Sequence, residues 1–86
     1  MPEPQNAAGE KLQEAFRQAL GLPADADIQN AAYGVTEGWD SAAHMALIAE
    51  IEGAFDIMLD TEEVIGMSSY SVAKETVQKH GVQFGA

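Results

Sequence analysis

Apolar residues recur at helical spacing in separate segments of the chain, and the first segment predicts a helix from about Ala7 to Leu20. Asn6 is a candidate N-cap, Gly21 is a candidate residue just beyond the C-terminus, and Pro23 prevents continuation. The apolar positions of this segment form one stripe that we expect to face the core: Leu12, Ala15, Phe16, Ala19 and Leu20.

Residues 21–40 predict a long connection. Connections longer than about 12–15 residues are uncommon unless they are functional or carry structure of their own. Asp27 can cap a single helical turn that stops at Gly34. Apolar residues recur along the segment, so we expect it to pack on the helices, with Trp39 as an anchor and Tyr33 at the core edge. These apolar residues are Leu22, Ile28, Tyr33, Val35 and Trp39.

A second helix is predicted from about Ser41 to Phe55, with a buried stripe of Leu47, Ile48, Ile51 and Phe55. The run Asp60-Thr61-Glu62-Glu63 is typical of a capping box and opens a short third helix that Gly66 ends. A fourth helix is predicted from about Tyr70 to His80, capped by Ser68 or Ser69 and closed by Gly81. Its inner face is Val72, Ala73, Thr76 and Val77.

The 86 residues therefore predict one all-α domain over residues 1–86, a four-helix bundle with a long first connection and a short third helix. We expect residues 1–6 and 83–86 to be frayed. No segment has the alternating pattern of a strand. No apolar run approaches the roughly 20 residues that cross a bilayer, and the first residues lack the pattern of a secretory signal. A cytoplasmic location is the default expectation.

The net charge of −10 is unevenly distributed. The only Lys and Arg residues are Lys11, Arg17, Lys74 and Lys79, so the long stretch between Arg17 and Lys74 carries carboxylates without a base. Such a surface repels nucleic acid and anionic membranes, and it attracts proteins with basic patches. The chain has no Cys, so no protein thiol or disulfide is available.

The candidate site is Gly38-Trp39-Asp40-Ser41-Ala42-Ala43-His44-Met45, at the start of the second helix. A hydroxyl at this position can cap the helix, or it can carry a phosphate close to the free amides of the first turn. The residues alone favour Ser41 as an ordinary cap. The adjacent Asp40 carboxylate opposes a phosphate there, which fits a site read by a cationic or metal-bearing enzyme.

Residues Trp39 to Phe55, WDSAAHMALIAEIEGAF, resemble the Asp-Ser-Leu attachment motif and the second helix of the acyl carrier protein family. The Trp-Asp-Ser-x-x-His-Met form is similar to discrete carriers of specialised pathways. The resemblance continues through the start of the third helix at Thr61 and of the fourth helix at Ser69, and covers roughly residues 10–82. One departure is Ala42, where the family usually has Leu.

The resemblance implies a fold of acyl-carrier type and a non-catalytic carrier. Ser41 would receive 4′-phosphopantetheine from coenzyme A through a separate phosphopantetheinyl transferase. Asp40 would help this transferase to recognise the site. The arm would hold an acyl intermediate as a thioester and carry it between partner enzymes. These partners would include the acyl-loading ligase or synthase, which would have basic patches, and the carrier itself would be a monomer. The expected partner-binding residues are Ala42, Met45, Ala49, Glu50, Glu52, Asp56, Glu62 and Glu63.

Other functions remain open on the sequence. An aminoacyl or peptidyl carrier would share the fold and Ser41, and an unmodified acidic helical adaptor would use Asp40 and Ser41 only as caps. His44 is interpreted as a surface contact residue, with contact to the arm as the alternative. Met45 and Met58 are interpreted as core gap-fillers. Two histidines without Cys make a zinc site improbable, and the spacing after Asp25 does not fit a calcium loop.

Overall fold

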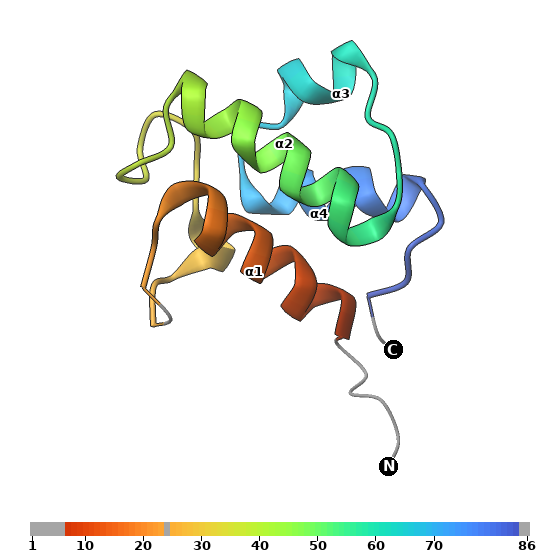
Figure 1. Ribbon diagram of the computed structural model, residues 1–86, viewed down its shortest axis with the longest axis horizontal. Helices are drawn as coiled ribbons and strands as arrows, with labels where there is room; N and C mark the ends of the chain where they lie inside the picture. Colours follow the sequence, from red (N-terminus) through yellow and green to blue (C-terminus); the bar gives the residue numbers. More distant parts are fainter. Residues whose placement is uncertain (1–6, 24, 85–86) are drawn as a thin grey trace.

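The computed structural model describes residues 7–23 and 25–84, and within them the protein is all-α. The helices are α1 (Ala7–Leu20), the 3₁₀ helix η1 (Ile28–Asn30), α2 (Ser41–Phe55), α3 (Thr61–Gly66) and α4 (Tyr70–Lys79) (Figure 1). No strand occurs in the described ranges, where an isolated bridge joins Ala32 and Ser69. The predicted helix bounds are confirmed to within one residue, while the candidate cap Asn6 lies outside the described residues.

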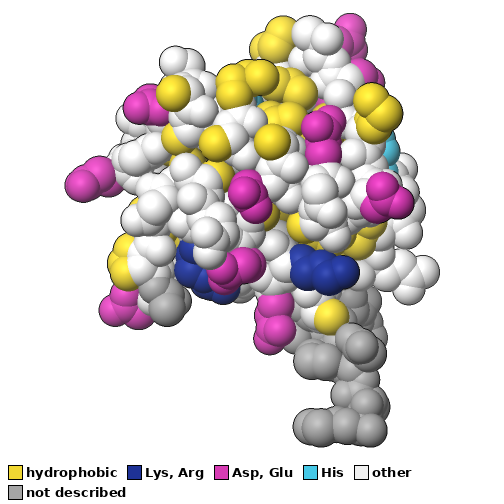
Figure 2. Space-filling view, viewed as in Figure 1, with side chains coloured by type: hydrophobic (Ala, Val, Ile, Leu, Met, Phe, Trp, Pro, Cys, Tyr) yellow, Lys and Arg dark blue, Asp and Glu magenta, His cyan; other side chains and the backbone are white. Residues whose placement is uncertain are grey.

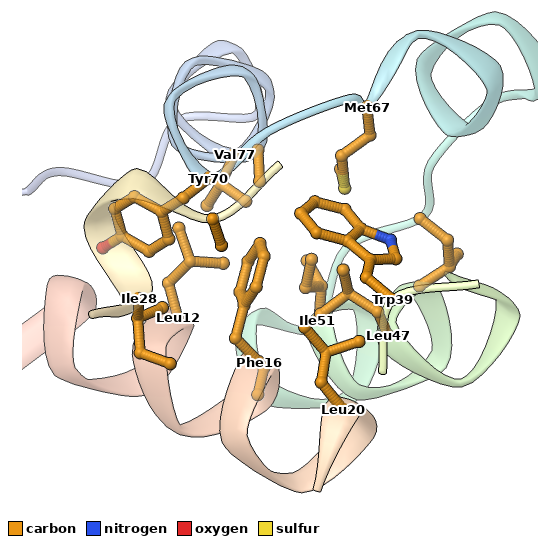
Figure 3. Packing of buried hydrophobic residues seen from close by; sticks show 14 residues of the cluster. Leu12, Phe16, Leu20, Ile28, Trp39, Leu47, Ile51, Met67, Tyr70 and Val77 are labelled. Atoms are coloured by element: carbon orange, nitrogen blue, oxygen red, sulfur yellow. The ribbon is translucent and has the colours of Figure 1, made fainter. Parts of the chain in front are cut away.

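Helices α1 and α2 run side by side, α4 lies behind α2, and α3 sits at one edge (Figure 1). The inner stripes of these helices form one core, at the centre of which lies the fully buried ring of Phe16 (Figure 3). Its ring meets those of Trp39 and Tyr70 edge-on, each at a centroid distance of 5.3 Å. Such contacts add about 0.5–1.5 kcal/mol each to the gain from burial.

The connection from α1 to α2 is buried at Ile28, Ala31 and Trp39 and exposed from Tyr33 to Val35. Ile28 and Trp39 are buried, as predicted, but Val35 is 84% exposed and Tyr33 is also exposed. The single helical turn ends at Asn30 and not at Gly34. Asp27 precedes that turn without capping its backbone, because its carboxylate instead accepts a hydrogen bond from the Asn30 side chain at 2.8 Å.

Gly38 allows the connection to pass close to the end of α1. Its φ is +88°, and a Cβ at this position would lie 2.8 Å from the carbonyl oxygen of Leu20. Both the positive φ and the close approach exclude a side chain. The glycine therefore lets the next residue, Trp39, turn its indole into the core.

The short helices begin where their capping residues predict. Asp60 Oδ1 accepts from the Glu63 amide at 2.8 Å, and Glu63 Oε1 accepts from the Asp60 amide at 3.0 Å, which completes the predicted capping box. Ser69, rather than Ser68, caps α4 by accepting from the Val72 amide. The α4 helix ends at Lys79, one residue before the predicted end.

Three expectations about packing are corrected. Met45 and Met58 are not gap-fillers, because they are 61% and 84% exposed, whereas Met67 is buried and points towards Trp39 (Figure 3). Phe55 is only half-buried, and its ring lies 6.2 Å from that of Phe84. Phe84 packs against the core, so the expected fraying from residue 83 is not met there, and residues 85–86 lie outside the described residues.

The burial of Phe16 and the exposure of Val35 predict a large effect on stability at the first position and a small one at the second. Phe16→Ala removes the ring on which two other aromatic rings pack, and should lower the free energy of unfolding by about 3–5 kcal/mol. Val35→Ala changes an exposed side chain and should change it by no more than about 0.5 kcal/mol. Urea denaturation curves, monitored by circular dichroism, compare the two variants with the wild-type protein. Equal effects of the two substitutions would contradict this description of the core.

Candidate functional site

The cap of α2 is Asp40, and the interpretation of Ser41 as the cap is therefore wrong. Asp40 has extended backbone angles, and its Oδ1 accepts a hydrogen bond from the Ala43 amide at 2.9 Å. Ser41 is the first residue of the helix and is exposed. Within the described part of the chain its hydroxyl has no hydrogen-bond partner. The fold therefore does not use this hydroxyl.

A cleft of about 420 Å³ opens beside Ser41, between the first turns of α2 and the end of α3. Its volume lies in the range of sites that hold small ligands, about 300–1,000 Å³. Most of its lining is apolar, and two of the lining side chains, Met45 and Ile65, remain strongly exposed. The lining residues are Tyr33, Ser41, His44, Met45, Val64, Ile65, Met67 and Ser68.

His44 connects three segments at the back of this cleft, and is not the surface contact residue that was predicted. Its Nδ1 accepts a hydrogen bond from Trp39 Nε1 at 3.0 Å, and its Nε2 lies 2.7 Å from the Val64 carbonyl oxygen. The imidazole also stacks on the Trp39 indole and meets the Tyr33 ring edge-on at 5.5 Å. One side chain of α2 therefore fixes both the end of the connection and the end of α3.

The far end of α3 is held by Glu63 and His80. His80 Nε2 lies 3.1 Å from Glu63 Oε1, so the start of α3 is joined to the end of α4. The Asp60 amide and, to a smaller extent, His80 hold the pKa of the Glu63 carboxyl below its ordinary value. Because α3 has no fully buried residue, these polar contacts of Glu63 and Val64 matter for its position.

The residues predicted to bind partners fall into two groups. Glu52 Oε2 accepts from the Leu59 amide at 2.9 Å, and Glu63 is engaged by the capping box and by His80, so both serve the fold. Asp56 ends α2 in the left-handed conformation, with φ +53°, and its side chain is exposed. The exposed members of the set are Ala42, Met45, Ala49, Glu50, Asp56 and Glu62.

Charge and apolar surface are arranged unevenly on the face that shows α2 and α3. Hydrophobic side chains gather over these two helices with carboxylates around them, and the Lys and Arg side chains visible on this face lie lower, over α1 (Figure 2). The absence of bases between Arg17 and Lys74 accounts for this separation. A partner that fits this face needs a basic rim around an apolar centre.

The residues beside Ser41 fit a phosphopantetheine arm. The hydroxyl is exposed for attachment, and the first amides of α2 lie at the positive end of a 15-residue helix. The neighbouring cleft offers apolar surface to the chain that follows the phosphate. The Asp40 carboxylate repels a phosphate on Ser41. It accepts a hydrogen bond from the Ala43 amide, which holds it at the N-terminal end of α2. These features are compatible with such an arm, apart from one unfavourable charge.

The motif at the start of α2 supplies Ser41, His44 and Met45 to the lining of the cleft, and the sequence does not predict the other lining residues. Tyr33 comes from the connection just before the motif, and the others come from α3 and its end, far from the motif in sequence: Val64, Ile65, Met67 and Ser68. Their proximity depends on how α3 is placed, which no local pattern predicts. In the described ranges, no group of three or more His, Asp or Glu side chains is placed to hold a metal ion, and no helix is long and apolar enough to cross a membrane.

The chain matches no protein-family model, and neither the curated proteins nor the solved structures compared with it include a match.

Substitutions at the cap separate its structural part from its charge. Asp40→Ala removes the acceptor for the Ala43 amide and should lower the free energy of unfolding by about 1 kcal/mol. Asp40→Asn keeps an acceptor and should leave stability nearly unchanged, as should Ser41→Ala, since Ser41 is not the cap. Urea titration of the three variants measures this. A larger loss in Ser41→Ala than in Asp40→Ala would reverse the assignment of the cap.

The lowered pKa of Glu63 predicts a dependence of stability on pH. Its ionised form is favoured by folding, so its contribution is present above the ordinary pKa of 4.5 and is lost as the pH falls through the lower pKa of the folded protein. Glu63→Gln keeps a capping-box residue without the charge. The wild-type protein should therefore have the higher urea midpoint above pH 4.5, and the two midpoints should converge in more acidic solution. A difference that stays constant with pH would contradict this.

Proposed function

We propose that this protein is a carrier that bears 4′-phosphopantetheine on Ser41 and holds an acyl intermediate on it as a thioester. The observation that carries the proposal is an exposed hydroxyl at the first residue of α2 that the fold does not use and that borders an apolar cleft. The all-α fold, with its long first connection and short α3, agrees with a four-helix bundle of acyl-carrier type.

Attachment requires that the Ser41 oxygen displace the adenosine 3′,5′-bisphosphate half of coenzyme A at its pyrophosphate. A bond forms between Ser41 Oγ and the phosphorus next to pantetheine, the bond to the second phosphate breaks, and adenosine 3′,5′-bisphosphate leaves. The hydroxyl proton passes to a base of the transferase. The protein contributes the exposed oxygen and its fixed position on the helix, and the arm, when bound, supplies the thiol that the chain lacks.

The cleft favours an acyl cargo over an aminoacyl one. Its walls include Met45, Val64 and Ile65 and contain no carboxylate that would pair with an ammonium group. An apolar chain gains about 0.8 kcal/mol for each methylene that it buries on such a surface. An aminoacyl or peptidyl carrier remains the alternative within this class.

The acidic surface supports partners with basic patches. Glu50, Asp56 and Glu62 are exposed and free of the fold's own contacts in the described chain, whereas Glu52 and Glu63 are occupied. Electrostatic attraction of this kind raises association rates by about 10- to 1,000-fold at low salt. We infer that the transferase and the loading ligase or synthase approach from the side of α2 and α3, where Ala42 and Met45 leave the centre apolar.

A second candidate function is an unmodified acidic adaptor that docks on basic proteins. The hydrogen bond from the Ala43 amide to Asp40 favours it, because capping explains an aspartate at this position without any modification. In that case Ser41 has no chemical role. The adaptor and the carrier share the acidic surface and differ in what happens to one hydroxyl.

Incubation with coenzyme A and a broad-specificity phosphopantetheinyl transferase, followed by intact-mass measurement, tests the proposal. The wild-type protein should gain the mass of one phosphopantetheinyl group, and Ser41→Ala should gain none. Ser71→Ala, which removes another exposed helical serine, is the matched control and should be modified fully. Asp40→Asn keeps the cap, so slower modification of that variant would report recognition of the carboxylate itself.

The outcome that favours the adaptor is equally direct. The wild-type protein would stay unmodified under conditions in which a control carrier protein is modified to completion. Modification that persists in Ser41→Ala would also contradict the assignment of the site.

A further inference from the structure

His44 occupies an unusual position for one of the two histidines of the chain. It is half-buried on α2, it faces Trp39 and Tyr33 of the connection, and it reaches the Val64 carbonyl at the end of α3. The end of the connection, α2 and the more distant α3 are therefore joined through one imidazole. Trp39 is the only tryptophan of the chain and is 2% exposed.

The partners of the ring determine where its proton lies. The indole Nε1–H of Trp39 can only donate, so Nδ1 of His44 must be the unprotonated, accepting nitrogen. The neutral ring then carries its proton on Nε2, which donates to the Val64 carbonyl oxygen at 2.7 Å. A neutral imidazole with this tautomer satisfies both neighbours, and no other protonation state does so.

A second proton on His44 breaks one of these contacts and keeps the other. Nδ1 becomes a donor and faces the indole N–H at 3.0 Å, so the hydrogen bond from Trp39 is lost. The Nε2–H bond to Val64 remains and becomes charge-assisted, which strengthens it. The buried indole N–H is then left without an acceptor, a state that buried polar groups avoid.

The titratable groups on the elements packed against His44 come from the connection, from α2 with its cap, and from α3. Tyr33 is the only other titratable residue in the lining of the cleft, and its side chain carries no carboxylate. On its own helix, Asp40 lies one turn earlier and caps the Ala43 amide. On α3, Glu63 is engaged by His80, and Glu62 is exposed to solvent.

We infer that His44 is a pH-sensitive positioning residue that fastens the end of the connection to α2 only while it is neutral. Protonation releases the indole of Trp39 from α2 and leaves α3 attached through Val64. Trp39 directly precedes Asp40 and Ser41, so the release loosens the segment that leads into the cap and the exposed hydroxyl. The consequence for attachment at Ser41 rests on the proposed function, whereas the hydrogen bond between Trp39 and His44 does not.

The single indole N–H is a direct probe of the hydrogen bond between Trp39 and His44. Its resonance and its hydrogen exchange are followed by NMR on the unmodified protein between about pH 8 and pH 5, the range in which histidines change charge. His44→Gln is the reference at each pH, because its amide has one acceptor and donors but does not titrate. His80→Gln is the matched control, since it removes the other histidine of the chain.

In the wild-type protein, protection of the indole N–H relative to His44→Gln should fall by about three- to tenfold as the pH is lowered, the factor that corresponds to one net hydrogen bond. His80→Gln should show the same fall. The indole shift should share one midpoint with the ring resonances of His44. Amides at the end of α3 should respond less than those of the connection.

Three results would overturn the inference. The protection of the indole N–H in the wild-type protein relative to His44→Gln could stay constant over the whole pH range. Alternatively, His80→Gln could abolish the pH response. The indole midpoint could also coincide with the ring resonances of His80 and not with those of His44. The last measurement needs only the wild-type protein, so it decides the question even if His44→Gln does not fold. Because no coenzyme A is present, a failure here is separate from a failure of modification at Ser41.

Discussion

Burial of the Trp39 indole with its N–H satisfied is the constraint on which the site depends. The ring is packed against Phe16 in the core, where an unpaired N–H would cost about 1–3 kcal/mol. His44 supplies the acceptor, and so the first turns of α2 must lie against the end of the connection. Gly38 makes the approach possible by leaving room next to the Leu20 carbonyl. The position of Ser41 follows from these contacts, because it lies between Trp39 and His44 in sequence.

The other wall of the cleft is held in a different way. No residue of α3 is fully buried, so this helix gains little from the hydrophobic core. It is held by its capping box, by the His80–Glu63 pair and by the contact of the Val64 carbonyl with His44. Each such contact has a net value of about 1 kcal/mol, and elements held in this way open more readily than core helices. The fold therefore places its least buried helix beside its candidate site.

The sequence predicts the helices well and the site only in part, for a physical reason. Helix bounds follow from local periodicity and from caps such as Asp60 and Ser69, which act within one turn. The exposure of Met45 and the role of His44 depend on where α3 and the connection come to rest, and such contacts join residues as far apart as His44 and Val64. Composition suggested that methionines fill the core. The structure uses only Met67 in that way among those discussed.

The position of the cap changes how Asp40 and Ser41 are understood together. A serine that caps a helix turns its hydroxyl towards the amides of the first turn, where it is occupied. Here the aspartate performs that task, so the serine can be the first helical residue with its oxygen facing solvent. The carboxylate that seemed to disfavour a phosphate at this site is therefore what leaves the hydroxyl available. A structural role for Asp40 therefore does not argue against the proposed chemical role of Ser41, because the two roles fall on two adjacent residues.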